Sequence, residues 1–209
     1  ALKRKDYERL VSEFKSLSGK VRIVNYFNTS RYNYAYAKAD YMDTILIESG
    51  ARQLDIGINI DIFPLDSLPG TYEQAKKYFL KINKLKNIIT LKHLEWEKDR
   101  KFYKNIIVIL AKVLNIIPDK IILSKIDKMS KKYKMEDSKY LAVMCGAWGV
   151  KEITNKKYFD KVKQESFAGR LYNVPVGYDE YLTGVYGDYM VPPPKSKQVT
   201  HHGSVAYWR

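Results

Sequence analysis

The residue of this sequence that most suggests chemistry is Asp61, in the middle of a predicted strand. Apolar and polar positions alternate around it, so Ile58, Ile60 and Ile62 fall on one face of the strand. We expect these isoleucines to fill the core and Pro64 to close the strand. Asp61 faces the other way, where a buried charge is costly unless it is paired or binds a metal. An aspartate on a solvated sheet face is an equally good interpretation.

Lys38 and Asp40 form a second candidate group, on a strand expected over residues 34–41. Alternation places both side chains on one face and the neighbouring alanines on the other. A lysine held there could bind phosphate as a point charge. Periodicity alone favours the alternative, which is a surface strand with an edge lysine.

The C-terminal region concentrates prolines, lysines and histidines. Three consecutive prolines, from Pro192 to Pro194, favour a polyproline II segment that could hold Lys195 and Lys197 at fixed positions for phosphate recognition. Two adjacent histidines follow a few residues later. Composition slightly favours the alternative, a structural tail docked on the protein.

The composition limits what other chemistry is available. The 209 residues are 45% hydrophobic, enough for one domain with a sizeable core. A single cysteine, Cys145, excludes internal disulfides and a cysteine-based zinc cluster. Only three histidines are present, which argues against a histidine-rich metal site, whereas a hard cation held by carboxylates is compatible. The patterns GxxxxGK[ST], HExxH and GxSxG are absent.

Strands followed by helices are predicted to position these candidates. A helix is expected over residues 5–17, where apolar residues recur at helical spacing and Gly19 follows. Antiparallel strands rich in β-branched and aromatic residues are expected next, at 21–27, 34–41 and 44–47. Further along, the patterns predict helices over 72–96, 101–115, 119–133 and 178–185, strands over 139–144 and 167–172, and an extended tail over 188–209.

Positive charge is concentrated in the predicted helices. Residues 71–134 contain 17 lysines or arginines and 6 aspartates or glutamates, a net charge of +11 out of +14 for the chain. We expect these residues to form a basic helical insertion in a core made of residues 1–70 and 135–209, an α+β fold with a mixed or antiparallel sheet. An anionic membrane, an anionic polymer or nucleic acid could face this surface, and a solvated basic surface is the plain alternative.

Three stretches of the sequence together resemble the LicD family, which includes bacterial phosphocholine transferases and fukutin-type ribitol-phosphate transferases. The first is Arg4-Lys5-Asp6-Tyr7-Glu8 and the second is the block from Asn59 to Asp66. The third extends from Tyr181 through Tyr186-Gly187-Asp188-Tyr189-Met190 to Pro192-Pro193, Lys197 and His201-His202. The order and spacing of the three stretches make the resemblance specific.

The resemblance implies a nucleotidyltransferase-like fold in which an aspartate pair and a third carboxylate hold a divalent metal at a nucleotide diphosphate. Asp61 matches the third carboxylate, and is therefore the expected catalytic residue and ligand of Mg²⁺ (or Mn²⁺). The implied donor is a CDP-alcohol, and the acceptor an anionic glycan such as teichoic acid or lipopolysaccharide. The implied location is the cytoplasm, with the inner face of the membrane as one option, contacted through residues 71–134. The expected substrate-binding residues are Lys38, Asp40, Asp66, Tyr186, Asp188, Lys195, Lys197, His201 and His202.

The sequence departs from the family at one point. Family members have a glycine-containing loop, a tryptophan and a run of aspartates just upstream of the segment that resembles Arg4 to Glu8, and this chain has no such run. We therefore expect a fragment with little or no transferase activity. A non-catalytic basic module that binds nucleic acid or an anionic membrane or polymer is the alternative function. Nucleic acid ranks lower, because no recognised nucleic-acid motif accompanies the pI near 9.5.

Overall fold

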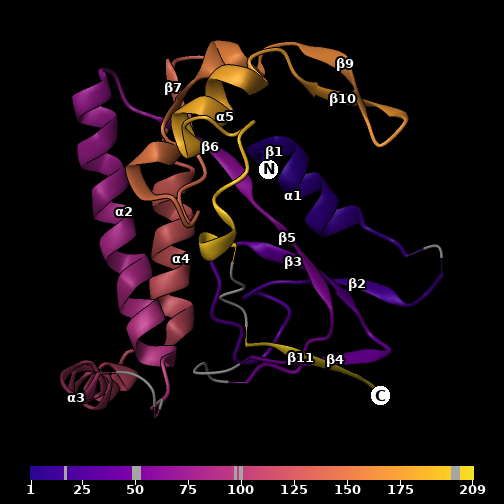
Figure 1. The fold of residues 1–209 in the computed structure, drawn as a ribbon. Helices are drawn as coiled ribbons and strands as arrows, with labels where there is room; N and C mark the ends of the chain where they lie inside the picture. Colours follow the sequence, from indigo (N-terminus) through magenta and orange to yellow (C-terminus); the bar gives the residue numbers. More distant parts are fainter. Residues whose placement is uncertain (17, 49–52, 97, 99–100, 199–202) are drawn as a thin grey trace.

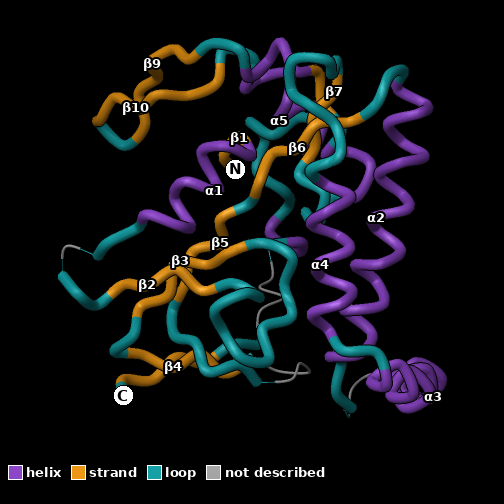
Figure 2. Tube along the Cα trace, turned by 180° about the vertical axis from the view of Figure 1, so that it is seen from behind, coloured by secondary structure: helices purple, strands orange, loops and turns teal. Residues whose placement is uncertain are grey.

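Two long helices stand side by side along one flank of several small sheets (Figures 1 and 2). The computed structural model describes residues 1–16, 18–48, 53–96, 98, 101–198 and 203–209. The two helices are α2 (Tyr72–His93) and α4 (Asp119–Ser130), and a shorter helix, α1 (Arg4–Glu13), lies on the other side of the sheets. The structure is therefore α+β with mainly antiparallel pairing, which confirms the predicted class.

A three-stranded antiparallel sheet carries the candidate residues of the N-terminal region. Its strand order is β2 (Val21–Val24), β3 (Ala37–Tyr41) and β5 (Asn59–Ile62). One face packs against α1 through a cluster that includes Tyr7 and Ala37. The opposite face carries the polar candidate residues beside Val24, which packs in a separate hydrophobic cluster. In the register between β3 and β5, Lys38 lies opposite Asp61, and Asp40 lies opposite Asn59.

A second sheet joins the long helices to the rest of the protein. Its order is β1 (Leu2–Lys3), β6 (Pro64–Leu68), β7 (Tyr140–Ala142) and β8 (Thr154–Asn155), with β1 parallel to β6 and the other pairs antiparallel. Leu68 of β6 shares the largest hydrophobic cluster with Phe79 of α2 and Ile126 of α4. The helices of region 71–134 thus share a core with the sheet, and their separation as an inserted unit remains a prediction.

The remaining elements lie around these two sheets. Strand β4 (Thr44–Ile47) pairs with β11 (Val205–Trp208), and β9 (Val162–Phe167) forms a hairpin with β10 (Arg170–Pro175). Two more α-helices are present, and 3₁₀ turns connect several elements. These are α3 (Phe102–Ala111), α5 (Tyr178–Tyr186), η1 (Lys112–Ile116), η2 (Gly149–Glu152), η3 (Lys156–Phe159) and η4 (Lys195–Lys197).

A capping box fixes the start of α2. The hydroxyl oxygen of Thr71 accepts a hydrogen bond from the backbone N–H of Gln74, and the Gln74 side chain accepts one from the backbone N–H of Thr71. These two bonds satisfy donors that the first turn of a helix leaves without partners. At the other end, Lys92 and His93 lie in the last turn, where positive charge is favoured by the helix dipole.

The prediction that the isoleucines around Asp61 fill the core is wrong for two of the three. Ile58 is 52% exposed and Ile60 is 72% exposed. Strand β5 lies at the edge of its sheet, and the cluster under α1 includes Ile62 but neither of the other two. Alternation correctly separated the two faces of the strand, but the apolar face is covered only at the Ile62 end.

One predicted boundary is confirmed only in part, and one predicted strand was wrong. The strand that carries Asp61 does end before Pro64, at Ile62, but Pro64 is itself the first residue of the next strand, β6, a position where the missing N–H of proline is tolerated. Residues 167–172 are not one strand but the tip of the β9–β10 hairpin. Ala168 and Gly169 both have positive φ there, +52° and +76°, as a two-residue hairpin turn requires.

Candidate active site

A cavity of about 320 Å³ lies between the sheet region that carries Asp61 and the helices α2 and α4. Its size is near the lower end of the range for small-molecule sites, roughly 300–1,000 Å³. Tyr34, Tyr36, Asp61 and Phe63 line one wall. The facing wall is mainly apolar and includes Ile89, Thr90 and Leu94 of the α2 region, Leu123 and Ile126 of α4, and Cys145 and Ala147 of the loop after β7.

Asp61 and Lys38 form an ion pair at this cavity. The Lys38 ammonium donates to Asp61 Oδ1 over 2.6 Å and to Asn59 Oδ1 over 2.9 Å. The Lys38 side chain is buried, whereas the Asp61 side chain is 38% exposed. The strand register explains the pair, because directly opposite residues on one face of an antiparallel sheet come close enough for their side chains to interact. Asp61 therefore presents a carboxylate, already paired with a cation, to a cavity that is open to solvent.

Three aromatic rings extend from this ion pair along the cavity wall. The Lys38 ammonium lies 4.6 Å from the centre of the Tyr34 ring. The Tyr36 ring centre is 5.2 Å from that of Tyr34 and 4.3 Å from that of Phe63. Burial raises the pKa of both tyrosines above its ordinary value, so the hydroxyls are protonated at neutral pH. The wall is thus a row of uncharged π faces beside a carboxylate.

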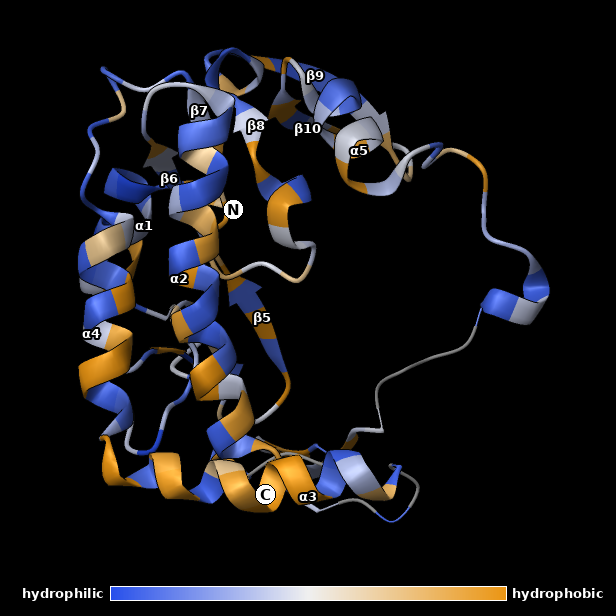
Figure 3. Cartoon of the chain, turned by 90° about the vertical axis from the view of Figure 1, so that its left-hand side faces the viewer, coloured by the Kyte–Doolittle hydropathy of each residue, from blue (hydrophilic) through white to orange (hydrophobic). Residues whose placement is uncertain are grey.

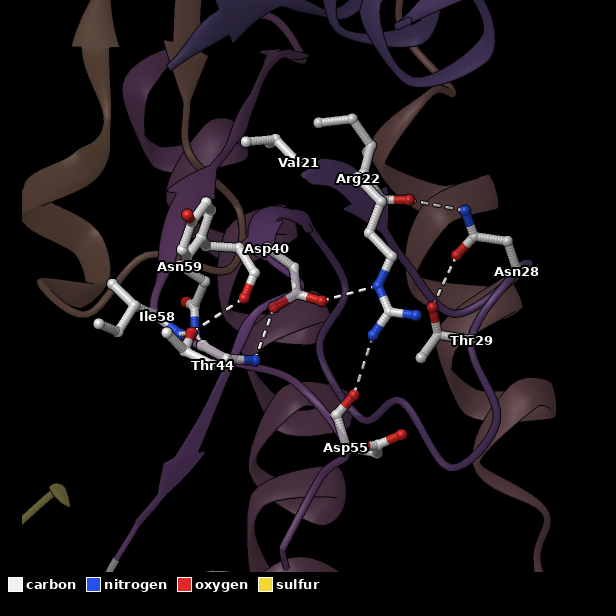
Figure 4. Close-up of polar contacts among 12 residues, drawn as sticks. Val21, Arg22, Asn28, Thr29, Asp40, Thr44, Asp55, Ile58 and Asn59 are labelled. Carbon is white, nitrogen blue, oxygen red and sulfur yellow. Dashed lines mark hydrogen bonds and ion pairs between the residues drawn. The ribbon is translucent and has the colours of Figure 1, made fainter. Parts of the chain in front are cut away.

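Asp40, predicted to bind substrate, is fully buried and holds the sheet together (Figure 4). Its Oδ2 accepts a hydrogen bond from Arg22 Nε over 2.7 Å, and its Oδ1 accepts one from the backbone N–H of Gly57 over 2.6 Å. Arg22 also donates to the backbone carbonyl of Asp55, over 3.1 Å. Both carboxylate oxygens are engaged by protein groups, and Asp40 is not among the residues that line the cavity.

Asp66, another predicted substrate-binding residue, is buried in an ion pair with Arg4. The guanidinium Nε and Nη2 donate to Asp66 Oδ1 and Oδ2 over 2.6 and 2.5 Å. Arg4 Nη1 also donates to Asp127 of α4 over 3.1 Å. This bidentate contact ties α1, β6 and α4 together, and it places the Asp66 carboxylate away from the Asp61 cavity.

The structure does not bring the predicted residues of the C-terminal region to the cavity. Tyr186, at the end of α5, packs edge to face on Trp148, with ring centres 4.8 Å apart. Asp188, Lys195 and Lys197 are exposed, and the segment that carries η4 loops out from the body of the protein (Figure 3). The expected docked tail is therefore not seen over the described part of this segment. The predicted His201 and His202 lie outside the described residues.

The described residues alone do not make a metal site. No group of three or more histidine, cysteine, aspartate or glutamate side chains gathers within the described ranges. Asp61 is a single carboxylate, and the Lys38 ammonium stands 2.6 Å from it, where a metal ion would otherwise neutralise its charge. Burial raises the pKa of the Cys145 thiol to about 12, so in the absence of a metal ion the sulfur is protonated at neutral pH.

The aromatic row is the part of this site that the sequence analysis did not identify. Tyr34 and Tyr36 alternate with alanines in step with Lys38, and this alternation is the signal that could have indicated rings on the same side as the lysine. The contribution of Phe63 and of the helical wall depends on how the chain packs in three dimensions.

Comparison with known proteins gives one informative match. No protein-family model and no solved structure matches the chain. An alignment of 78 residues, 38% identical, joins it to the lipopolysaccharide cholinephosphotransferase LicD of Haemophilus influenzae. This chain is a relative of LicD over part of its length. The match covers 36% of this chain and 29% of LicD, so the chain spans less than a third of the curated relative it matches. The LicD relationship confirms the resemblance noted in the sequence, while the roles of single residues remain predictions.

Proposed function

We propose that this chain is part of a LicD-type transferase that moves phosphocholine, or a similar alcohol phosphate, from a CDP-alcohol to a cell-surface glycan. The name of the H. influenzae relative supports phosphocholine and a lipopolysaccharide-type acceptor. Teichoic acid is the second acceptor in this proposal. The observation that supports the transferase proposal is the aromatic cavity lined by Asp61, whose carboxylate pairs with the buried Lys38 ammonium.

The cavity wall has the chemistry that a choline headgroup needs. A quaternary ammonium cannot donate hydrogen bonds, and proteins recognise it through the negative faces of aromatic rings. Tyr34, Tyr36 and Phe63 supply such faces, and Asp61 supplies a negative charge beside them. The methyl groups would pack against the apolar side chains of α2 and α4 across the cavity.

Lys38 supplies the matching positive charge for the phosphate. The Lys38 ammonium now donates hydrogen bonds to Asn59 and Asp61. It could donate to a phosphate oxygen as well, or in place of one of these two contacts. In the transfer, a P–O bond forms between the acceptor hydroxyl and the phosphorus of the phosphocholine group, and the P–O bond to cytidine monophosphate breaks. The bridging oxygen leaves with the electron pair of the broken bond, and the proton of the acceptor hydroxyl passes to solvent.

A complete site is part of the proposal and needs more than the described residues. We propose a nucleotidyltransferase-like arrangement and a divalent metal, Mg²⁺ or Mn²⁺, to which Asp61 would contribute one ligand. The metal would neutralise charge on the nucleotide diphosphate, and further carboxylates would be required to hold it. Because a single carboxylate cannot do this, the 209-residue chain alone is expected to show little or no turnover of CDP-choline. Turnover at the rate of intact transferases would contradict this expectation. A cytoplasmic location, at the inner face of the membrane, belongs to the same proposal.

Binding of CDP-choline to the 209-residue chain, measured by isothermal titration calorimetry, tests the proposal without relying on turnover. We expect saturable binding that Lys38→Met weakens about tenfold or more, because a charge-assisted contact contributes roughly 1.5–3 kcal/mol. Lys20→Met is the matched control. The Lys20 ammonium also pairs with an aspartate, Asp43, over 2.7 Å, but on the surface and outside the cavity. Absence of saturable binding by the wild-type chain would overturn the proposal.

The choline end of the cavity is tested by comparing two donors. We expect Tyr36→Leu to weaken binding of CDP-choline by roughly 5- to 30-fold, equivalent to about 1–2 kcal/mol of cation–π attraction. Binding of CDP-glycerol, which has no cationic headgroup, should change much less. Equal losses of affinity for both donors would show that Tyr36 has only a structural role. The phosphate contact would then still be tested by the Lys38→Met experiment.

A further inference from the structure

The helix α3 and the adjoining turn η1 expose an unusual amount of apolar surface. Along α3 and η1 the side chains that point outward are almost all large and hydrophobic, and Ile116 is 81% exposed. The exposed apolar residues of this stretch and its continuation into α4 are Phe102, Tyr103, Ile106, Ile107, Ile109, Leu110, Val113, Ile116, Ile117 and Ile121. A contiguous apolar surface of this kind marks an interaction site in a soluble protein.

Only a narrow side of α3 packs against the protein. Its buried residues are Asn105, Val108 and Ala111, spaced by three positions, so one stripe faces inward and the rest of the helix is free. Figure 3 shows α3 lying across the ends of α2 and α4 at one end of the molecule, and most of its length has the colour of hydrophobic residues. A helix that is apolar on most sides is expected inside a core or in lipid, not in water.

The charges around α3 suit a negatively charged surface. Lys101, Lys104 and Lys120 are exposed at its edges. From residue 101 to residue 118 the sequence contains no aspartate or glutamate. Lysines that flank apolar side chains can extend their stems so that the ammonium groups reach lipid phosphates while the apolar groups enter the bilayer. Because lysines flank the apolar face, the segment fits an anionic bilayer better than an uncharged protein partner.

The dimensions exclude a membrane span for this segment. At 1.5 Å per residue, ten α-helical residues extend about 15 Å, half the thickness of the hydrocarbon core. Among the described helices, none is both long and apolar enough to cross a bilayer. A short helix that is apolar outward and lysine-rich at its edges instead lies in the plane of the interface.

We propose that α3 and η1 form an interfacial segment that binds the surface of an anionic membrane. The segment would place the protein with α3 flat on the lipid headgroups and α2 and α4 directed away from the bilayer. His93 and Leu94, at the α3 end of helix α2, line the candidate cavity, so the cavity is near the same end of the molecule. This inference does not depend on which group is transferred, and it extends the proposed function by stating where an acceptor would be met.

Vesicle co-sedimentation of the 209-residue chain tests the inference. We expect the wild-type chain to sediment with vesicles of phosphatidylcholine and phosphatidylglycerol, and much less with phosphatidylcholine alone. The double variant Ile107→Glu/Leu110→Glu places two carboxylates on the outward face of α3, and should reduce the bound fraction about tenfold or more. Phe167→Glu/Leu171→Glu is the matched control, because it changes two exposed apolar residues on the β9–β10 hairpin. The control should bind like the wild type.

Three co-sedimentation results would overturn the inference. They are a wild-type chain that stays in the supernatant with anionic vesicles, equal binding by the α3 variant and the wild type, and equal losses in the α3 variant and the hairpin control. Size-exclusion chromatography with light scattering separates one other explanation. If the wild-type chain is a dimer and Ile107→Glu/Leu110→Glu makes it monomeric, the face joins two copies of this chain and is not a lipid surface. Circular dichroism of each variant checks that it is folded.

Discussion

Replacing Arg4 with methionine is expected to lower the free energy of unfolding by about 3–5 kcal/mol, because it leaves a buried carboxylate without its counter-charge. The Arg4 guanidinium contacts both oxygens of Asp66, whose side chain is only 1% exposed, and also reaches Asp127. Methionine retains most of the length of the side chain, so the loss reports the charge contact more than the packing. Urea unfolding followed by circular dichroism measures the change.

Two further variants make this result specific. Arg9→Met changes an exposed arginine of the same helix, and its effect should stay within about 0.5 kcal/mol of the wild type. Arg4→Met/Asp66→Leu removes both buried charges, and should recover a large part of the lost stability, since an apolar pair can replace a buried ion pair at little cost. An Arg4→Met protein that unfolds at the wild-type urea concentration would show that the Asp66 carboxylate finds water or another donor.

Gly57→Ala is expected to destabilise the protein by about 1–3 kcal/mol or more, because the new methyl group has no space. A Cβ on Gly57 would lie 2.4 Å from the backbone oxygen of Tyr41 and 2.5 Å from that of Thr44. Backbone oxygens cannot rotate away as a side chain can, so the strand would have to move. That shift would also strain the hydrogen bond from the Gly57 N–H to Asp40.

Gly184→Ala is the control for this substitution. Gly184 lies within α5, where a Cβ would meet no atom within 4 Å, and alanine is favoured over glycine in a helix by up to about 1 kcal/mol. The two alanine variants should therefore change the unfolding midpoint in opposite directions. Thermal unfolding of both proteins measures the difference. If the midpoint temperature of Gly57→Ala equals that of the wild type, the turn between β3 and β4 is free to adjust.

Local patterns predicted the secondary structure well where one side of an element is buried along its whole length. The helix expected at 72–96 is α2, and the strand expected at 139–144 contains β7, because both contribute to the largest core cluster. The predicted faces of the strands were also informative, since Lys38 and Asp61 do project to the same side. The exposed Ile60 shows the limit of the method, because alternation tells which residues share a face but not whether anything covers it.

Residue roles were harder to predict, because they depend on partners far away in the sequence. Nothing around Asp66 indicates that Arg4, 62 positions earlier, holds it in the interior. Likewise, Asp40 is unavailable to a ligand because its carboxylate accepts hydrogen bonds from Arg22 and from the backbone N–H of Gly57. No sequence motif marks either of these partners. Asp40, Asp61 and Asp66 therefore differ in burial, and of these three only Asp61 lines the cavity beside helices α2 and α4.

The pairing of β11 with β4 has a consequence for the lysines that precede it. Helix α5 holds one side of this region, and hydrogen bonds from Arg209 to Thr44 and Asp55 secure the other side beyond β11. Lys195 and Lys197 consequently belong to a tethered segment and not to a loose end. Because both ends of the segment are fixed, the two ammonium groups can sample a smaller volume than they could on a free end. Part of the conformational entropy that they would lose on binding an anion is therefore already lost on folding.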